Sequence, residues 1–264
     1  MDIPSNQFEN ELFCLNFELK ALSDLLIRGE AERWVHNFIT QDIEMEHLER
    51  YKHALQFVNN KKVLDIACGC GYGSYYLAKN GTPDHITGVD ISEDSIRYAN
   101  FRYNLPNIER FLGNAETFEE PNSFDVVLSF ETIEHLRDFE SFLKGVRNSL
   151  VKGGKLLIST PIVPATQTKC NNPYHVIEWS FKDFHQLLSK YFAIDQILLQ
   201  SIAMKQPPIS FSGRALRKFK RDILHISPPR PTNEFINGRL IKYNDSMQIG
   251  EIQSGYQLVE CHKD

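Results

Sequence analysis

Cysteine is scarce and irregularly placed in this chain of 264 residues, and long apolar runs do not occur. The five cysteines are odd in number, and Cys68 and Cys70 form a single pair without a second one, which argues against a disulfide framework and against a zinc site. Charged residues interrupt each long apolar stretch, and no basic segment followed by an apolar run opens the sequence. We therefore expect no membrane span, no signal peptide and a cytoplasmic location.

An excess of positive charge is also missing. The formal net charge is −5, which gives no general reason to expect nucleic acid as a partner. Hydrophobic residues make up 42% of the chain and charged residues 24%, which is ordinary for a globular protein with a real core. The length allows one large α/β domain with additions, or at most two small domains.

Four segments differ in character. Residues 1–60 are expected to form a helical extension or cap, because leucines recur there at helical spacing. Residues 61–200 alternate short apolar strands with amphipathic helices, which predicts a parallel sheet covered by helices on both faces. Residues 201–254 are rich in proline and basic residues and are interpreted as an irregular insertion and lid. Residues 255–264 are expected to supply the last strand of the core.

A glycine turn follows the first strand, in the run VLDIACGCGYGS at residues 63–74. Gly69, Gly71 and Gly73 are spaced as G-x-G-x-G, and a serine replaces the third glycine of the dinucleotide-binding pattern. Asp65 precedes the turn, where its charge would repel a phosphate. A cationic ligand without phosphate fits better, and S-adenosylmethionine is such a ligand. The alternative is a tight strand-to-helix connection that binds nothing.

Two further strand ends carry polar groups that suit the same ligand. Asp90 ends the next strand, at the place where a carboxylate can accept both hydroxyls of a ribose. Asn114 and Ala115 follow the third strand, where a side-chain amide and a backbone N–H can read the edge of an adenine. Asp90 alone fits a helix cap equally well, but three consecutive strand ends with fitting chemistry favour a nucleoside site.

Five motifs in order resemble the class I S-adenosylmethionine-dependent methyltransferases: VLDIACGCGYGS, GVDIS, GNAETF, FDVVLSFETIEHL and LVKGGKLLIST. The resemblance covers residues 60–200 and implies a Rossmann-like sheet of seven strands whose last strand runs antiparallel. Two departures are Ala67, where glycine is more usual, and Asn114, where aspartate is common. The cofactor-binding residues that the resemblance implies are Asp65, Ala67, Cys68, Gly69, Gly71, Tyr72, Asp90, Ile91, Asn114, Ala115 and Phe130.

A narrower resemblance rests on the runs GEAERWV, EHLERY and NPYHVIEW. Together with the glycine turn, these runs look like methyltransferases of bacterial glycan and natural-product sugar pathways. This resemblance implies transfer of a methyl group to a hydroxyl of a sugar, glycan or glycosylated small molecule. Fold alone does not give the acceptor, so the site has to be argued separately.

The run FETIEHLRD follows the fourth strand and carries two carboxylates and an imidazole. Glu131, Glu134 and His135 stand at i, i+3 and i+4, so in a helix they share one face. Such a set suits Mg²⁺, Mn²⁺ or Zn²⁺. The run resembles the metal-binding stretch of O-methyltransferases of ubiquinone biosynthesis and of small-RNA 3′ ends. In the RNA group a further histidine ligand has a context like HVIEW here, which implies His175 as the fourth ligand.

The same residues fit catalysis without any metal. A hydroxyl is a poor nucleophile until its proton is removed, so His135 or His175 is expected to act as a general base, with Glu131 beside it. Much of the rate would come from alignment of the two reactants. The predicted activity is therefore O-methylation, with metal assistance and metal-free base catalysis both open.

Three other functions compete with this prediction. An RNA 2′-O-methyltransferase would recruit the basic run at residues 214–221, although the acidic net charge disfavours it. An NAD-dependent oxidoreductase is disfavoured by Asp65 and by the serine in the glycine turn. A non-catalytic binding domain is the third alternative. An oligomer is also possible, because the apolar helix at the start of the chain offers a face for a neighbour.

Overall fold

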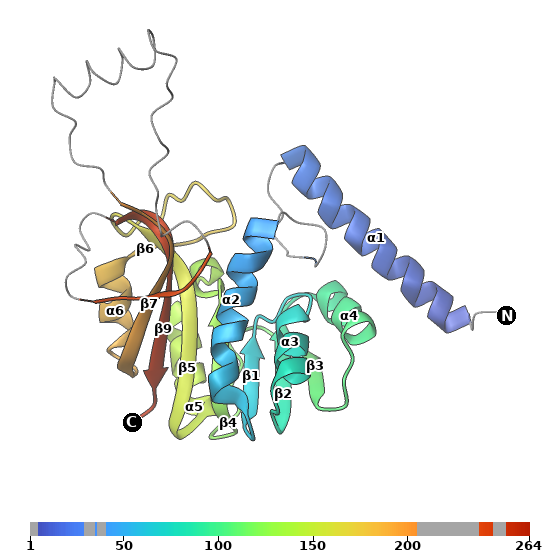
Figure 1. The fold of residues 1–264 in the computed structure, drawn as a ribbon, viewed down its shortest axis with the longest axis horizontal. Helices are drawn as coiled ribbons and strands as arrows, with labels where there is room; N and C mark the ends of the chain where they lie inside the picture. Colours follow the sequence, from blue (N-terminus) through green and yellow to red (C-terminus); the bar gives the residue numbers. More distant parts are fainter. Residues whose placement is uncertain (1–4, 29–34, 36–40, 205–237, 245–251) are drawn as a thin grey trace, which may run out of the picture.

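The computed structural model describes residues 5–28, 35, 41–204, 238–244 and 252–264 of the chain (Figure 1). These residues form one mixed sheet with helices packed against it. The expected Rossmann-like architecture is confirmed, with the strand order β3-β2-β1-β4-β5-β9-β7-β8. The strands are β1 (Lys62–Ile66), β2 (His85–Asp90), β3 (Ile108–Leu112), β4 (Phe124–Phe130), β5 (Leu150–Val163), β6 (Trp179–Ser180), β7 (Ala193–Met204), β8 (Ile241–Lys242) and β9 (Ile252–His262).

Parallel pairing joins β3, β2, β1, β4 and β5, while β9 runs antiparallel between β5 and β7. Seven strands thus form the main sheet, as expected, with the last strand of the chain antiparallel. Two-residue strands extend it: β6 pairs with the end of β5, and β8 pairs with β7. The order reverses between β1 and β4, and in an open sheet of this kind ligands bind beyond the carboxyl ends at such a point.

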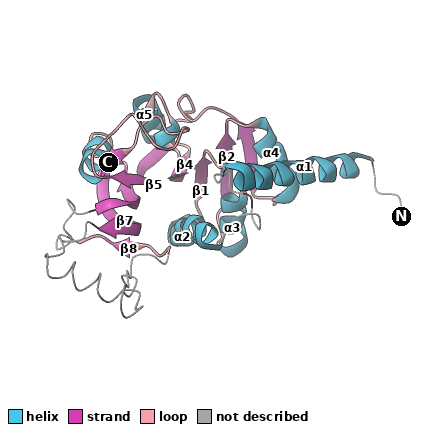
Figure 2. Cartoon of the chain, turned by 90° about the horizontal axis from the view of Figure 1, so that it is seen from above, coloured by secondary structure: helices cyan, strands magenta, loops and turns pink. Residues whose placement is uncertain are grey.

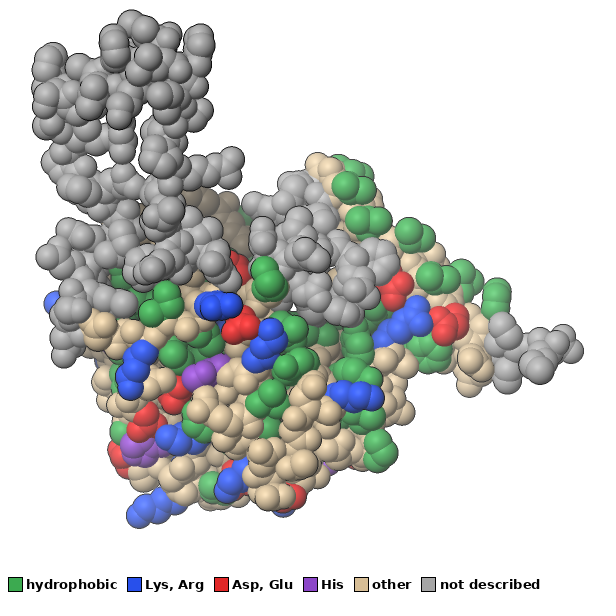
Figure 3. Space-filling view, viewed as in Figure 1, with side chains coloured by type: hydrophobic (Ala, Val, Ile, Leu, Met, Phe, Trp, Pro, Cys, Tyr) green, Lys and Arg blue, Asp and Glu red, His purple; other side chains and the backbone are tan. Residues whose placement is uncertain are grey.

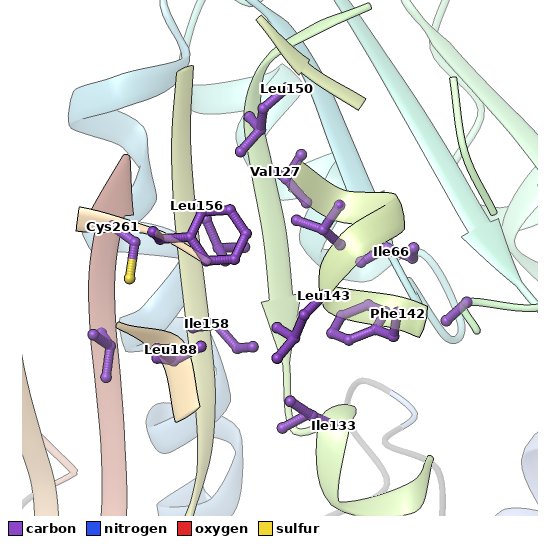
Figure 4. Close-up of a cluster of buried hydrophobic side chains, with 14 of the residues drawn as sticks. Ile66, Val127, Ile133, Phe142, Leu143, Leu150, Leu156, Ile158, Leu188 and Cys261 are labelled. Carbon is purple, nitrogen blue, oxygen red and sulfur yellow. The ribbon is translucent and has the colours of Figure 1, made fainter. Parts of the chain in front are cut away.

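Helices cover both faces of the sheet (Figure 2). One face carries α2 (Gln41–Val58) and α3 (Tyr72–Asn80), whose Tyr51, Val58 and Leu77 pack on β1, β2 and β4. The other face carries α5 (Phe139–Ser149) and α6 (Phe181–Leu188), and their buried cluster is shown in Figure 4. The remaining helices are α1 (Ser5–Arg28), α4 (Glu93–Arg102) and the short 3₁₀ helix η1 (Ile133–His135).

Local sequence explains where the helices begin. The side chains of Ser92, Asp138 and Ser180 accept a hydrogen bond from the backbone N–H three residues later, at the starts of α4, α5 and α6. Such caps satisfy backbone donors that the first helical turn leaves without partners. Because the caps fix where each crossover helix starts, they also fix the lengths of the loops at the carboxyl edge of the sheet.

The structure differs from the expected segment boundaries in two places. The predicted cap at residues 1–60 contains α2, which packs on the sheet next to α3 and is part of the core layers. The predicted insertion at 201–254 overlaps the end of β7 and the start of β9, because the antiparallel ladder between them continues to the pair Met204 and Ile252. The basic run at residues 214–221 lies outside the described residues. Within the described part of the chain, no helix is both long and apolar enough to cross a bilayer.

Candidate functional site

A cavity of about 520 Å³ opens at the carboxyl ends of β1, β2 and β4, within the described residues. Its size suits a small organic ligand. The loops after β1, β2, β3 and β4 form its floor and walls, and α2 closes one side. The lining residues are His47, Tyr51, Ala67, Cys68, Gly69, Cys70, Tyr72, Val89, Asp90, Ile91, Gly113, Asn114, Ala115, Glu116, Phe130, Glu131, Thr132, His135, Leu136, Arg137 and Tyr174.

The glycine turn brings the backbone close to the cavity through left-handed conformations. Ala67, Gly69 and Gly71 have φ angles of 59°, 55° and 78°. Glycine adopts these angles without strain, which explains why glycine is more usual at the position of Ala67. A Cβ on Gly71 would lie 2.6 Å from the Cβ of Ala99. The turn therefore needs glycine at position 71 both for its backbone angle and for its close packing on α4.

Asp90 ties the turn to the neighbouring strand. Its Oδ2 accepts a hydrogen bond from the N–H of Gly69 at 2.9 Å, and its Oδ1 accepts one from Ser92 at 2.9 Å. Asn114, at the end of β3, accepts a hydrogen bond from the N–H of Glu116 at 2.9 Å. Both side chains line the cavity in fixed orientations. The cavity thus presents a carboxylate and a carboxamide at adjacent strand ends, with the exposed side chain of Ile91 next to Asp90.

Asp65 is not among the residues that line the cavity, although it was expected to face the ligand. Its carboxylate is buried behind the turn, where it accepts hydrogen bonds from Ser74 at 2.6 Å and from the Tyr51 hydroxyl at 3.2 Å. Burial raises the pKa of Asp65 to about 6, although both hydrogen bonds act in the opposite direction. Tyr51 lines the cavity and lies between the cavity and Asp65. Asp65 therefore holds Ser74 and Tyr51 from behind the cavity wall.

The acidic run after β4 does not form the single helical face that its spacing predicts. Glu131 has a φ of 52°, and only Ile133–His135 form the short helix η1. The left-handed backbone at Glu131 turns its side chain toward Ser159, whose hydroxyl donates to it at 2.7 Å, and toward Arg50, whose guanidinium lies 3.3 Å away. Glu131 consequently lines the cavity as an ion-paired carboxylate from the strand end.

Glu134, His135 and His175 do converge, with one possible ligand atom from each lying within 4.8 Å of the others. Glu134 is fully buried, and its Oε2 accepts a hydrogen bond from Thr160 at 3.0 Å. Its Oε1 has no hydrogen-bond partner. Burial, with the neighbouring Glu131 carboxylate, raises the pKa of Glu134 well above its ordinary value. Glu131 is not part of this group of three, so the predicted set of four ligands is incomplete.

The two histidines of this group differ in their contacts. His135 lines the cavity, and its Nδ1 lies 3.1 Å from the carbonyl oxygen of Tyr174, which requires the Nδ1–H tautomer. His175 does not line the cavity and packs edge-on against the His135 ring, with 4.9 Å between the ring centroids. Its Nδ1 lies 2.7 Å from Glu178, and its Nε2 lies 3.0 Å from the Asn172 amide. Of the two predicted bases, His135 alone reaches the cavity.

Sequence reasoning missed the contribution of α2. His47 and Tyr51 line the cavity from this helix, and Arg50 lies behind Glu131. Burial, with the charge of Arg50 adding to it, lowers the pKa of His47 to about 3, so its imidazole is neutral at physiological pH. The available signal was the run EHLERY, in which His47, Arg50 and Tyr51 stand three and one residues apart and so fall on neighbouring turns of one helix.

This arrangement defines the class of protein as a Rossmann-like domain with a cavity at the carboxyl ends of its parallel strands. Residues 57–204 match the family described as "Methyltransferase domain", which is more than half of the chain. The chain belongs to that family. This membership agrees with the resemblance of the five motifs and with the order of the strands.

The chain aligns with only part of the length of each of three curated relatives. The chain is 34% identical to a phthiotriol/phenolphthiotriol dimycocerosates methyltransferase of Mycobacterium ulcerans, over 45% of each chain. It is 31% identical to a fatty-acid O-methyltransferase of Mycolicibacterium smegmatis, over 52% of this chain and 49% of the relative. It is 29% identical to a ubiquinone biosynthesis O-methyltransferase of Idiomarina loihiensis, over 62% of this chain and 69% of the relative. The chain thus aligns with about half of the first two relatives.

Solved structures agree on the fold. An S-adenosylmethionine dependent methyltransferase from Mesorhizobium loti has a TM-score of 0.55 at 14% identity, covering 83% of this chain and 98% of that one. A phosphoethanolamine N-methyltransferase of Haemonchus contortus, in complex with S-adenosyl-L-methionine, has a TM-score of 0.53 at 18% identity, covering 82% of this chain and 52% of that one. At such identities the likeness concerns the fold alone.

Proposed function

We propose that this protein is an S-adenosylmethionine-dependent O-methyltransferase. The observation that carries the proposal is His135, which borders the cavity and has its Nδ1 positioned against the carbonyl of Tyr174. This contact holds the imidazole in the tautomer whose Nε2 carries a lone pair. A positioned neutral imidazole is the group that a hydroxyl acceptor requires. The printed names of two relatives, which are O-methyltransferases, support this choice of acceptor atom.

The cavity residues fit the proposed cofactor. Asp90 offers a carboxylate for the ribose hydroxyls, Asn114 and Ala115 offer polar groups for the adenine, and Ile91 offers an exposed apolar surface. When bound, the cofactor supplies a methyl group on a positively charged sulfur. The acidic residues around the cavity, Asp90, Glu116 and Glu131, favour this charge over a pyrophosphate.

The residues of this chain supply proton removal and orientation. His135 is placed to accept the proton of an acceptor hydroxyl at Nε2, and the Tyr174 carbonyl would stabilise the resulting imidazolium through Nδ1–H. The methyl group would pass from sulfur to the hydroxyl oxygen, with the neutral thioether as the leaving group. His175, held by Glu178 and Asn172, fixes the orientation of the His135 ring. Tyr51, Tyr72 and Phe130 form an aromatic wall that keeps the acceptor aligned and partly shields it from water.

For the acceptor, we propose a sugar or a similar small molecule with several hydroxyl groups. Support comes from the polar residues that line the same cavity as His135, which include Glu116, Glu131 and Arg137. Such groups can hydrogen-bond to neighbouring hydroxyls and select a polar acceptor over an apolar one. The first relatives are named for lipid and fatty-acid substrates, so long-chain acceptors belong in the same assay panel.

Replacing His135 with alanine is expected to reduce methyl transfer about 10²- to 10⁴-fold, because the general base is lost. Cofactor affinity should stay within about threefold, since the Gly69–Asp90 contact is untouched. Transfer of tritium from labelled S-adenosylmethionine, measured over a panel of sugars, glycosides and fatty acids, gives the rate, and calorimetry gives the affinity. The matched control is His85→Ala, because His85 lies at the opposite end of β2. Full activity of the His135 variant contradicts the assignment.

We also propose that Glu134, His135 and His175 hold a divalent metal ion. The supporting observation is Oε1 of Glu134, a buried carboxylate oxygen without a hydrogen-bond partner that lies 4.0 Å from Nε2 of His135. A cation would satisfy this oxygen and offset the cost of burying the charge. Carboxylate and imidazole ligands suit Mn²⁺ or Zn²⁺. The metal and the proposed proton transfer compete for Nε2 of His135, so one measurement decides between them.

Adding Mn²⁺ or Zn²⁺ after dialysis against a chelator is expected to raise the melting temperature by about 5 °C at 100 times the dissociation constant. Glu134→Gln should abolish this shift, while Glu131→Gln should preserve it, because Glu131 lies outside the group of three. Thermal unfolding monitored by intrinsic fluorescence, with elemental analysis of the untreated protein, supplies the data. A melting temperature that no divalent ion changes, in a protein free of metal, excludes the metal site and leaves His135 as the base.

A further inference from the structure

An apolar stripe runs along the outer side of α1 and is exposed over most of its length. Figure 3 shows it as a row of hydrophobic side chains on the part of the helix that extends beyond the sheet. No other described residue covers it. The most exposed members are Phe8 at 57%, Leu12 at 49%, Leu15 at 49%, Leu19 at 59% and Leu26 at 75%. Water contact with so many large apolar groups on one helix is unusual, and such a patch marks a site of interaction.

The opposite side of α1 is already fixed to the domain. Phe13, Cys14 and Phe17 pack against Tyr98 of α4, and the Phe17 and Tyr98 rings stack with centroids 4.8 Å apart. Arg102 of α4 lies 2.7 Å from Glu11 and forms a second ion pair with Glu18. The helix is therefore held in one orientation, and the stripe points away from its own domain. A helix that is apolar on two opposite sides is normally buried on both.

The stripe has the spacing of a helix-pairing seam. Its six members stand at positions 8, 12, 15, 19, 22 and 26, so the intervals are four, three, four, three and four residues. This repeat of 3.5 residues is the one that keeps apolar side chains facing a partner helix in a coiled coil. The positions that border such contacts are occupied by Glu9, Glu11, Asn16, Glu18 and Ser23. The pattern continues for nearly the whole of α1.

We propose that α1 pairs with α1 of a second copy of this chain, forming a two-fold dimer through this seam. A self-complementary stripe meets its own copy with every apolar layer matched, which is the usual way in which a homodimer interface closes. Six large side chains contribute on the order of 500 Å² of apolar surface per helix, and the flanking residues bring this toward the ~800 Å² per partner of a standard interface.

The charge of α1 disfavours a membrane surface as the occupant. Residues 5–28 carry four acidic and two basic side chains. Helices that lie on anionic membranes are rich in Lys and Arg on their polar side. The narrow width of the seam also differs from the broad apolar face of a membrane-surface helix. Charge and spacing thus both favour a second copy of the chain.

The mass of the full chain in solution tests the proposal. We expect twice the chain mass of 30.5 kDa at micromolar concentration, measured by sedimentation equilibrium. The double variant Leu12→Glu/Leu19→Glu should shift the protein to the single-chain mass, because it would place two carboxylates of each copy in the apolar seam. The matched control is Ile27→Glu on the same helix: Ile27 is 79% exposed but lies off the seam, so this variant should remain a dimer.

Several outcomes overturn the dimer. A wild-type protein of single-chain mass at 50 µM does so, and this result does not depend on whether any variant folds. A dimer that survives the double variant shows that another surface makes it. A monomer that co-sediments with phosphatidylglycerol vesicles, and loses that property in the double variant, assigns the seam to lipid. Circular dichroism and cofactor binding show whether the variants keep their fold, since the substituted side chains point away from the domain.

Discussion

Gly71→Ala is expected to destabilise the protein by about 2–4 kcal/mol and to weaken cofactor binding at least tenfold. Two causes add up. The φ of 78° costs a residue with a Cβ about 1 kcal/mol or more, and the new methyl group would lie 2.6 Å from the Cβ of Ala99 and 2.9 Å from Nε of Arg110. Relief of this contact must move α4 or Arg110, which donates to the Gly71 carbonyl.

Gly153 offers a matched control for this prediction. Its φ is 73°, close to that of Gly71, but nothing lies within 4 Å of the position of its Cβ. Gly153→Ala therefore pays the backbone cost alone, and we expect a loss of about 1 kcal/mol with unchanged cofactor affinity. Urea unfolding and calorimetry with S-adenosylmethionine measure both quantities. Equal losses in the two variants would show that packing around Gly71 contributes nothing.

The features that the sequence predicted correctly depend on residues close together in the chain. The strands β1 to β5 follow from short apolar runs, and the glycine turn follows from three glycines within five residues. The carboxylate of Asp90 lies at the cavity because the carboxyl ends of parallel strands meet at one edge. Local patterns suffice there, because each element is fixed by its own period and its own cap.

The features that the sequence did not predict depend on contacts between segments that are distant in the chain. Asp65 of β1 turns away from the cavity because Tyr51 of α2 donates a hydrogen bond to it and lies against Gly73. Both faces of β1 are buried, so strand alternation does not tell which side Asp65 takes. Glu131 leaves the face shared by Glu134 and His135 because its backbone is left-handed. The i, i+3, i+4 rule applies to an α-helix, but the chain makes a turn at Glu131, so the rule fails there.

The same dependence on distant contacts explains why the sequence does not place α2 against the sheet. Arg50 bonds to Gln200, which is 150 residues away, and its guanidinium lies over the ring of Tyr256 at 4.8 Å. These partners lie on β7 and β9, late in the chain. The hydrophobic periodicity of residues 41–58 gives no information about them. The candidate site is thus assembled from strand ends that the sequence locates and from a helix whose role only the fold reveals.

Arg50→Met is expected to destabilise the protein by about 3 kcal/mol, because it removes one partner of a buried ion pair. Arg50 is 1% exposed and faces Glu131 at 3.3 Å, and its Nε donates to Gln200 at 3.0 Å. Its charge also lowers the pKa of Glu134, in opposition to burial. Methionine keeps an unbranched apolar side chain but is shorter and has no charge, so Glu131 and Glu134 would face each other without the guanidinium.

Lys52→Met, two residues along α2, separates this buried pair from a general effect of losing a cation. Lys52 pairs with Glu49 at 2.9 Å, but its side chain is 43% exposed, and such surface pairs contribute about 0.5 kcal/mol or less. We expect a fivefold or greater difference between the two losses in urea unfolding at pH 7. Comparable losses of unfolding free energy in Arg50→Met and Lys52→Met would mean that Glu131 finds another partner once Arg50 is gone. The buried arginine would then have no special part in holding the strand-end carboxylate.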